Sequence, residues 1–409
     1  MNAPRPGLRP LDDALADLLS QARPLAGVEH VPTFEADGRV LAHDLVSALQ
    51  VPPQDNSSMD GYAVRCAEIA DEGVALPVSQ RIPAGSEAHP LAPGSVARIF
   101  TGAPVPAGAD AIVMQEDVQA LEDGRARILR VPSAGQWIRR SGEDITRGAV
   151  VLRAGERLGP AATGLAAAIG LAVLPVARRP RVALFSTGDE LVMPGEVPPE
   201  AMRPGAIYNS NRFFLRSLLL RLGCEVRDLG IVPDQREATL QALATAARDN
   251  DLILTSGGVS VGEEDHIKPA VQQLGRLDLW QIAMKPGKPF AYGRVGEAHF
   301  IGLPGNPVSS FVTFVLLVRP FLLALMGASE TAPAAWQLPA HFDWPRPDRR
   351  REFLRARRDA EGGLVLFPNQ SSGVLTSVAW ADGLIDNPGG QAIARGDRVR
   401  FLPLAELLA

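Results

Sequence analysis

The sequence predicts a multidomain protein of the α/β plus β class. Three sequence patterns along its 409 residues support this prediction. Strand and helix patterns alternate after Pro180, short apolar runs separated by Pro and Gly turns fill the region before Gly142, and the last ~80 residues return to β character. A chain of this length is expected to form roughly two to four domains.

The predicted domain boundaries are placed where the pattern of apolar and turn residues changes. Apolar residues at helical spacing start the chain, and Leu11, Leu15 and Leu18 illustrate that spacing. We therefore predict an N-terminal helix (1–27), a linking domain (28–49 and 145–176), a small β-domain (50–144), an α/β domain (177–327) and a C-terminal β-domain (328–409).

The α/β domain rests on five consecutive patterns. The segments "RVALFS", "EVRDLGIV" and "DLILTS" are typical of strands, whereas "NRFFLRSLLLRLG" and "REATLQALATAARD" are typical of helices. This alternation favours a doubly wound sheet, in which ligands bind at the carboxyl ends of the strands. Near the C-terminus, "FLRARRDAEGGLVLFP" is predicted to form a hairpin.

The run "FVTFVLLVRPFLLALM", Phe311 to Met326, is the longest apolar stretch. It is short for a membrane span and Arg319-Pro320 interrupts it, so we predict a buried helix that ends the α/β domain. No signal peptide is recognisable at the N-terminus.

Composition and charge exclude several classes. The net charge of -5 argues against a general nucleic-acid binder. The two cysteines, Cys66 and Cys224, lie far apart with no CxxC, which argues against a zinc ribbon or a disulfide framework and favours a reducing compartment. We expect a cytoplasmic protein with neither a membrane nor a nucleic-acid partner.

Three carboxylates follow predicted strands of the same sheet: Glu190, Asp234 and Asp265. If these strands are neighbours, the carboxylates converge, and hard oxygens beside a phosphate are what Mg²⁺ prefers. The competing interpretation is that each is a solvated loop residue or a helix cap.

The loop "TSGGVSVGEED" combines a glycine pair with those acids. Gly257, Gly258 and Ser260 are candidates to hold a phosphate. The loop matches neither G-x-G-x-x-G nor a P-loop, so the sequence argues against a dinucleotide site and a Walker ATPase.

Two further loops suit an oxyanion. In "MKPGKPFAYG", Lys285 and Lys288 place two point charges on a Pro-Gly turn. The alternative is a pair of solvated turn lysines.

The loop "LPGNPVSS" leads into the apolar helix, whose N-terminus offers a second anion position. Pro304 and Pro307 stiffen this loop, and Asn306 or Ser309 can donate hydrogen bonds. A plain helix N-cap is the alternative.

Polar residues also occur in the two β-domains, where surface loops are the competing interpretation. The candidates are Asp60, Thr101, Arg139, Arg140 and Asp144 in the small β-domain, and Arg350, Arg351, Ser371 and Ser372 in the C-terminal β-domain. No arrangement of the six histidines suggests a nucleophile and its base.

Taken in order, these motifs resemble the molybdopterin molybdenumtransferase family, that is, MoeA and the E-domains of plant and animal molybdenum-cofactor proteins. The resemblance covers roughly residues 10 to 400 and rests on the ordered set "DNSSMDGYAV", "RIFTGAPVPAGADAIVMQED", "RRSGEDI", "STGDEL", "TSGGVSVGEEDHIK", "MKPGKPFAYG", "GLPGNPVSS" and "RREFLRA".

The resemblance implies a four-part, elongated subunit, a homodimer and an α/β domain similar to MogA-type adenylyltransferases. The implied reaction converts adenylylated molybdopterin and molybdate into molybdenum cofactor and AMP with Mg²⁺. The site is expected between the α/β domain of one subunit and the small β-domain of the other. Transient partners in cofactor synthesis and delivery are also implied.

Residue by residue, the resemblance assigns two groups. The family's acidic residues fall on Asp60, Asp144, Glu190, Asp234 and Asp265, with Thr101 and Arg139 beside them. Positions associated with molybdate and phosphate binding fall on Lys285, Lys288, Ser309 or Ser310, Arg350 and Ser372.

Gln281 departs from members that carry a basic residue at that position.

Three alternatives remain open: ATP-dependent adenylylation of molybdopterin, a non-enzymatic scaffold of the same fold, and tungstate in place of molybdate.

Overall fold

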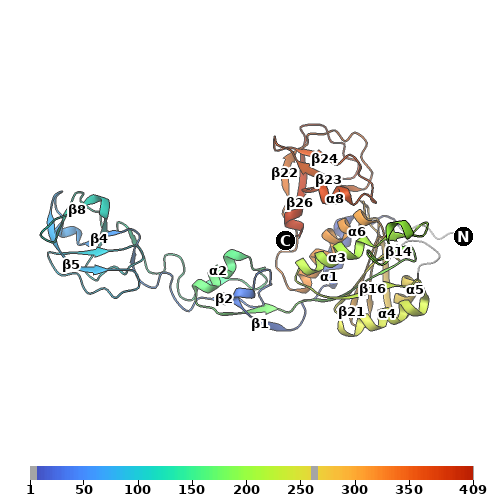
Figure 1. Cartoon of the computed structure of the whole chain (residues 1–409), viewed down its shortest axis with the longest axis horizontal. Coiled ribbons are helices and arrows are strands. Elements are labelled where there is room, and N and C mark those ends of the chain that lie inside the picture. Colours follow the sequence, from blue (N-terminus) through green and yellow to red (C-terminus); the bar gives the residue numbers. More distant parts are fainter. Residues whose placement is uncertain (1–6, 259–265, 409) are drawn as a thin grey trace.

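The computed structural model describes residues 7–258 and 266–408. Its parts are arranged along an extended molecule (Figure 1). The small β-domain lies at one end, the linking domain lies in the middle, and the α/β domain and the C-terminal β-domain lie together at the other end. The predicted fold class is confirmed, whereas the domain boundaries stay a prediction.

The small β-domain is one sheet of short strands in the order β7-β4-β6-β5-β9-β8. The strands are β4 (Gly61–Val64), β5 (Ala75–Ile82), β6 (Val96–Ile99), β7 (Ala111–Met114), β8 (Val118–Ala120) and β9 (Arg125–Ile128), and β3 (Asn56–Ser57) pairs separately with β10 (Ile138–Arg139). Gly61 is required at its position, because a Cβ there would lie 2.0 Å from the carbonyl oxygen of Val113 on the paired strand β7.

The linking domain is built from two segments that are distant in the sequence. Its elements are β1 (Val28–Pro32) paired with β12 (Val173–Ala177), β2 (Leu45–Val46) paired with β11 (Val150–Leu152), and helix α2 (Pro160–Ala168). Apolar residues of both segments form one core, including Leu41, Leu152 and Leu174.

The α/β domain contains a six-stranded sheet in the order β16-β13-β17-β21-β20-β18. Its strands are β13 (Arg181–Thr187), β16 (Glu225–Val232), β17 (Leu252–Ser256), β18 (Gly275–Gln281), β20 (Pro289–Val295) and β21 (Ala298–Leu303), and its helices include α3 (Ser210–Arg221), α4 (Arg236–Asp249) and α5 (Ile267–Leu274). The four strands β16, β13, β17 and β21 are parallel, whereas β20 and β18 extend the sheet antiparallel. The five predicted patterns are confirmed; the antiparallel strands were not predicted.

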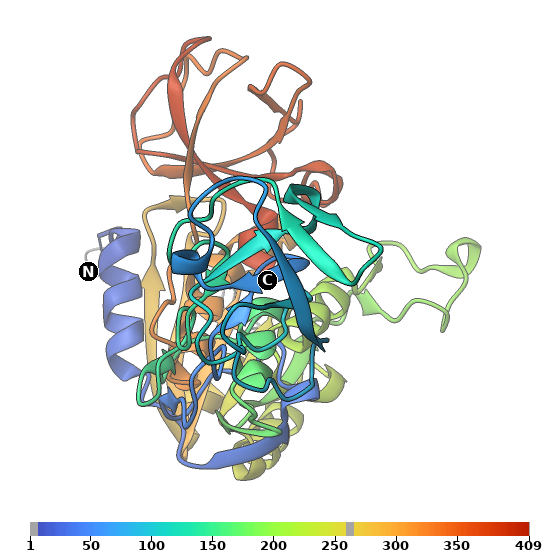
Figure 2. The same ribbon diagram turned by 90° about the vertical axis from the view of Figure 1, so that its left-hand side faces the viewer.

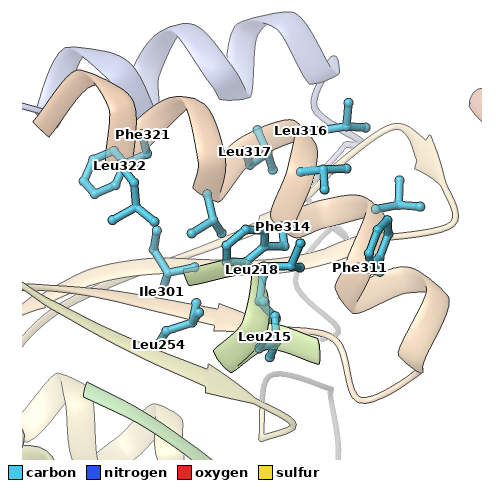
Figure 3. Close-up of a cluster of buried hydrophobic side chains, with 14 of the residues drawn as sticks. Leu215, Leu218, Leu254, Ile301, Phe311, Phe314, Leu316, Leu317, Phe321 and Leu322 are labelled. Carbon is cyan, nitrogen blue, oxygen red and sulfur yellow. The ribbon is translucent and has the colours of Figure 1, made fainter. Parts of the chain in front are cut away.

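Both faces of this sheet are covered, as in a doubly wound fold. Val182 and Leu184 of β13 pack with α3 and with the apolar helix over Pro307–Leu325. Ala183 and Phe185 pack with α4 and α5 on the other face. This two-residue alternation explains why the parallel strands read as continuous apolar runs. Figure 3 shows the first of these cores between the strands and the apolar helix.

The apolar helix corrects one prediction. It is not broken at Arg319-Pro320 but runs continuously over Pro307–Leu325, as α6 (Pro307–Thr313), a π-helical turn (Phe314–Val318) and α7 (Arg319–Leu325). The Arg319 N–H donates to the carbonyl of Phe314, five residues back, and this widened turn carries the helix past a proline that has no N–H to donate. The helix is long and apolar enough to span a membrane, but 94% of it is buried inside the protein, as predicted.

The C-terminal β-domain adds a second sheet in the order β19-β23-β25-β26-β22. Its elements are β19 (Met284–Lys285), β22 (Trp336–Pro339), β23 (Arg351–Arg358), β24 (Leu364–Leu366), α8 (Thr376–Trp380), β25 (Gly383–Asn387), β26 (Arg398–Pro403) and α9 (Leu404–Leu408). The predicted hairpin is confirmed, because β23 pairs antiparallel with β24. Strand β19 belongs to the α/β segment of the chain, so its pairing with β23 joins the two domains.

The N-terminal helix α1 (Leu11–Gln21) also joins these domains. Arg351 of β23 forms an ion pair with Asp12 of α1 at 2.8 Å and a two-bond pair with the buried carboxylate of Asp386 at 2.5 and 2.7 Å. The guanidinium therefore links α1, β23 and β25.

Arg351→Met is expected to lower the free energy of unfolding by about 2–3 kcal/mol, because it leaves the Asp386 carboxylate buried with less compensation. Chemical denaturation measures this change. Arg349→Met, two residues earlier at an exposed position, is the control and should change stability little. Equal stability of the two variants would contradict the role given to Arg351.

Candidate active site

A cavity of about 560 Å³ lies at the carboxyl ends of β13 and β17. Strand-end loops, the start of α3, the start of α6 and one loop of the C-terminal domain form its walls. The lining residues are Ser186, Thr187, Glu190, Leu191, Ile207, Tyr208, Asn209, Ser210, Asn211, Ser256, Gly257, Gly305, Asn306, Pro307 and Gly373. Strands β14 (Leu191–Val192) and β15 (Ile207–Tyr208) carry a protruding arm beside it (light green in Figure 2).

Two buried donors in the cavity wall have no hydrogen-bond partner among the described residues. They are the Ser186 hydroxyl and the side-chain nitrogen of Asn209, whose residues are 0% and 1% exposed. The Asn209 side-chain oxygen caps α3 by accepting from the N–H of Arg212. The side-chain nitrogen of Asn209 is therefore the atom that lacks a partner among the described residues. Buried polar groups are nearly always satisfied, and these two therefore point to a ligand that accepts hydrogen bonds.

The glycine pair shapes the same wall. Gly257 and Gly258 have φ of 94° and 67°. A Cβ on Gly257 would lie 2.8 Å from the carbonyl oxygen of Thr187, and one on Gly258 would lie 2.6 Å from Ile267. The loop therefore needs glycine at both positions for local geometry. Gly257 lines the cavity, whereas Ser260 lies outside the described residues.

The strand-end carboxylates are partly brought together. Strands β16, β13 and β17 are neighbours, which is the condition that convergence required. Glu190 is exposed and borders the cavity, and the N–H of Asp234 lies 3.5 Å from a carboxylate oxygen of Asp189 in the next loop. Asp265 lies outside the described residues.

Within residues 7–258 and 266–408, no three His, Cys, Asp or Glu side chains form a group that would hold a metal by itself. Mg²⁺ is usually held by one or two carboxylates together with substrate phosphates, so oxygen donors such as Glu190 and Asp234 fit it by chemistry.

Lys285 belongs to a charged network at the junction of the two domains. Its Nζ lies 3.3 Å from Glu352, which is fully buried, and 3.5 Å from Asp348. Arg350 holds Asp348 through two bonds of 2.8 and 2.9 Å, and these hydrogen bonds keep the pKa of Asp348 far below its usual range. The predicted residues Lys285 and Arg350 are therefore brought together, while Lys288 is exposed in the same turn.

Glu352 and Asp348 were not identified from the sequence. Glu352 also accepts from the Trp344 indole at 2.8 Å, so it is fixed in place. The available signal was the acidic residues that flank the arginines in "DRRREF", but the pairing that makes them neighbours of Lys285 is long-range.

Helix α6 connects the lysine turn to the cavity. A Cβ on Gly287 would lie 2.6 Å from the Thr313 hydroxyl, so the turn rests directly on this helix. Pro307, at the other end of α6, lines the cavity six residues away, or about 9 Å along the axis. The cavity and the lysine network are thus two parts of one region.

The "LPGNPVSS" and "NQSSG" loops meet at this helix. The N–H of Val308 donates to the carbonyl of Ser372 at 3.0 Å. Ser309 and Ser310 are buried, and the Ser310 hydroxyl has no partner within the described part of the chain. Pro304 is buried behind the cavity, with its carbonyl 3.5 Å from the Ser256 hydroxyl.

The predicted residues of the small β-domain form a separate group. Asp60 accepts from both the N–H and the hydroxyl of Thr101, each at 2.8 Å. Arg139 is exposed on strand β10, and Asp144 is exposed in the bend that follows it. This domain lies at the opposite end of the molecule from the cavity, so one chain does not bring the two groups together (Figure 1).

Comparisons with known proteins cover nearly the whole chain. Residues 9–170 match the MoeA N-terminal region (domain I and II), residues 183–324 match a probable molybdopterin binding domain, and residues 337–404 match the MoeA C-terminal region (domain IV). A molybdopterin molybdenumtransferase from Haemophilus influenzae is 42% identical over 81% of this chain and 80% of its own length. The chain belongs to the molybdopterin molybdenumtransferase family. The resemblance inferred from the ordered motifs is confirmed.

Other members of the molybdenumtransferase family agree in sequence and in structure. Molybdopterin molybdenumtransferase 2 from Mycobacterium tuberculosis is 38% identical over 91% of this chain and 93% of its own length. A crystal structure of the molybdopterin biosynthesis moeA protein from Pyrococcus horikoshii superposes with a TM-score of 0.85 at 29% identity, covering 97% of this chain and 100% of that one. The extended arrangement of domains therefore has a close counterpart in a solved member of the family.

The Asp60–Thr101 pair gives a test within the small β-domain. The N–H and hydroxyl of Thr101 lower the pKa of Asp60, so the carboxylate stays ionised to lower pH. Thr101→Val removes the hydroxyl donor and is expected to raise that pKa, which moves the acidic limb of the activity profile to higher pH. Carboxyl NMR titration and pH–rate profiles measure both shifts. Thr101→Ser keeps a hydroxyl and should leave both in place; an unchanged pKa of Asp60 in Thr101→Val would contradict this role.

Proposed function

We propose that this protein inserts molybdenum from molybdate into adenylylated molybdopterin, releasing AMP and giving molybdenum cofactor. The observation that carries the proposal is the cavity at the strand ends, with its unpartnered donors on Ser186 and Asn209, next to the Lys285 network. Membership of the molybdenumtransferase family supports transfer of molybdenum as the reaction class.

The cavity suits the molybdopterin end of the substrate. Its neutral donors and the starts of α3 and α6 favour an anionic or carbonyl-bearing ligand. Glu190 and Asp234, with Asp265, are the residues proposed to hold Mg²⁺ beside the pyrophosphate. A bound Mg²⁺ would supply charge neutralisation at the pyrophosphate.

The lysine turn suits molybdate, a tetrahedral dianion. Lys285 and Lys288 are two of only three lysines in a chain with 41 basic residues, the third being Lys268. An ammonium is a compact point charge, whereas a guanidinium is a planar fork, so the two are not interchangeable around a tetrahedral ion. Arg350 and the buried serines of α6 are proposed to complete this position, and preorganised charge is expected to supply most of the rate.

The small β-domain is proposed to complete the site in a homodimer. The small β-domain, which carries Asp60, Thr101, Arg139 and Asp144, lies at the opposite end of the molecule from the α/β domain of its own chain (Figure 1). A second subunit that places its β-domain over this cavity would combine the two groups. We further propose that the protein acts in the cytoplasm with transient partners that supply the substrate and receive the cofactor.

The test is direct. Purified protein with Mg²⁺, adenylylated molybdopterin and molybdate is expected to release AMP and retain molybdenum-bearing pterin, and omission of molybdate should abolish AMP release. Absence of molybdate-dependent AMP release would reject the proposal. Formation of adenylylated pterin from ATP and molybdopterin would establish the adenylyltransferase activity instead, and tungstate in place of molybdate measures metal selectivity.

A further inference from the structure

A group of aromatic and guanidinium side chains adjoins the Asp60–Thr101 pair. In three adjacent strands, Arg98 of β6 is in register with Tyr62 of β4 and Arg81 of β5. The Arg98 guanidinium carbon lies 5.2 Å from the ring centre of Tyr62 and 4.6 Å from that of Phe100, and Arg81 lies 4.5 Å from the same Phe100 ring. We refer to Tyr62, Arg81, Arg98 and Phe100 as the β-domain patch.

The two arginines of the patch, Arg81 and Arg98, have no ion-pair partner among the described residues of the domain. Arg98 donates instead to the carbonyl of Gly61 at 2.8 Å and to the side chain of Gln115 at 2.7 Å. Arg81 is exposed and the other three residues are half-buried, so the patch is open to solvent. In the neighbouring Asp60 carboxylate, one oxygen accepts both donors of Thr101.

This combination has a specific chemical match. Aromatic rings and guanidinium planes stack on a planar heterocyclic base with little regard to its identity. Guanidinium forks also pair with phosphate oxygens in a two-bond geometry. A ligand that uses both features carries a base and a phosphate on one small molecule, which describes a nucleoside monophosphate.

We propose that the β-domain patch binds the adenosine monophosphate part of the adenylylated substrate, with the base on Phe100 and the phosphate at Arg81 and Arg98. This inference rests on the proposed function, which supplies a substrate that contains this group. It also gives the small β-domain a definite task, because Asp60 and Thr101 adjoin the patch and so would lie beside the bond that releases AMP.

The experiment is calorimetric titration of the full-length protein with AMP. Wild type is expected to bind AMP saturably and more tightly than either adenosine or inorganic phosphate. Arg81→Gln and Phe100→Leu should each weaken AMP binding by about fivefold or more, because the first removes a charged partner of the phosphate and the second removes the ring on which the base stacks. Phe100→Tyr retains an aromatic ring and should bind like wild type. Arg127→Gln, an exposed arginine on β9 of the same domain, is the matched control.

Photolabelling with 8-azidoadenosine monophosphate locates the ligand independently, and the peptide that contains Phe100 is expected to carry the label. Arg81 is exposed, so Arg81→Gln should keep its fold, which thermal unfolding verifies. No AMP binding by wild type, equal affinity in Arg81→Gln and Phe100→Leu, or a label confined to the α/β domain would overturn the patch as the site. Any of these three results would reject the patch but not the proposed function, which the assay of molybdate-dependent AMP release tests separately. Conversely, AMP binding at the patch without molybdate-dependent AMP release would reject the proposed function but not the patch.

Discussion

Lys285→Gln is expected to lower kcat/KM for molybdate by about 10²- to 10³-fold, the loss typical of removing one preorganised charge from an active site. Lys285 lies between the carboxylates of Glu352 and Asp348, which hold its ammonium at the junction of β19 and β23. Glutamine keeps the length of the side chain approximately but provides no charge for a dianion. Steady-state kinetics of AMP release at varied molybdate concentration measures the change.

Two further variants and one stability measurement test whether the charge of Lys285 itself is required. Lys285→Arg restores the charge as a planar fork, and we expect it to recover only part of the activity. Arg346→Gln removes a positive charge from an exposed position near Asp348 and should leave kcat/KM unchanged. The thermal unfolding of Lys285→Gln also needs checking, because among the described residues Glu352 would keep just the neutral donors of Trp344 and Asn387. A stable Lys285→Gln protein with wild-type kcat/KM would remove this lysine from the site.

The α/β domain could be predicted from the sequence because its signals are local. The segments that form β16 and α4 have the expected periodicity and are bounded by turn residues, so their observed ends coincide with the predicted ones. Strand β20 was not predicted, because its residues follow the Pro-Gly turn of "MKPGKPFAYG" and read as a loop that carries lysines. Its antiparallel pairing with β18 and β21 depends on partners that a local pattern cannot indicate.

The candidate site also contains some residues that the sequence could indicate and others that it could not. Glu190, Asp234 and Gly257 follow neighbouring strands of one parallel sheet, so their placement at one edge of that sheet was inferable from the fold class alone. Ser186 opens the "STGDEL" motif but was not singled out in it, and Asn209 lies in no quoted motif; their burial without a partner among the described residues is what identifies both as donors. Glu352 was missed for another reason: its contact with Lys285 joins residues 67 positions apart, across two domains.

The separation of Asp60 from the cavity leads to an experiment on mixed dimers. Asp60→Asn and Lys285→Gln are each expected to be nearly inactive alone, because every cleft of either homodimer lacks one of the two groups. When the two variants are unfolded together and refolded in equal amounts, half of the dimers should contain one chain of each kind. In such a dimer, one cleft combines an intact α/β domain with an intact β-domain, so about a quarter of the wild-type activity should return.

A site completed within one chain gives the opposite result, because each chain then carries its own defect and mixing restores nothing. The control combines Asp60→Asn with an inactive Asp144→Asn chain; both changes lie in the small β-domain, so every cleft of a mixed dimer lacks one acidic group and the two should not complement each other. Recovery by the first pair but not by the second would establish that the cavity of one subunit works with Asp60 of the partner. Activity that stays absent after mixing, although mixed dimers are detected by mass spectrometry, would place the whole reaction within the single chain.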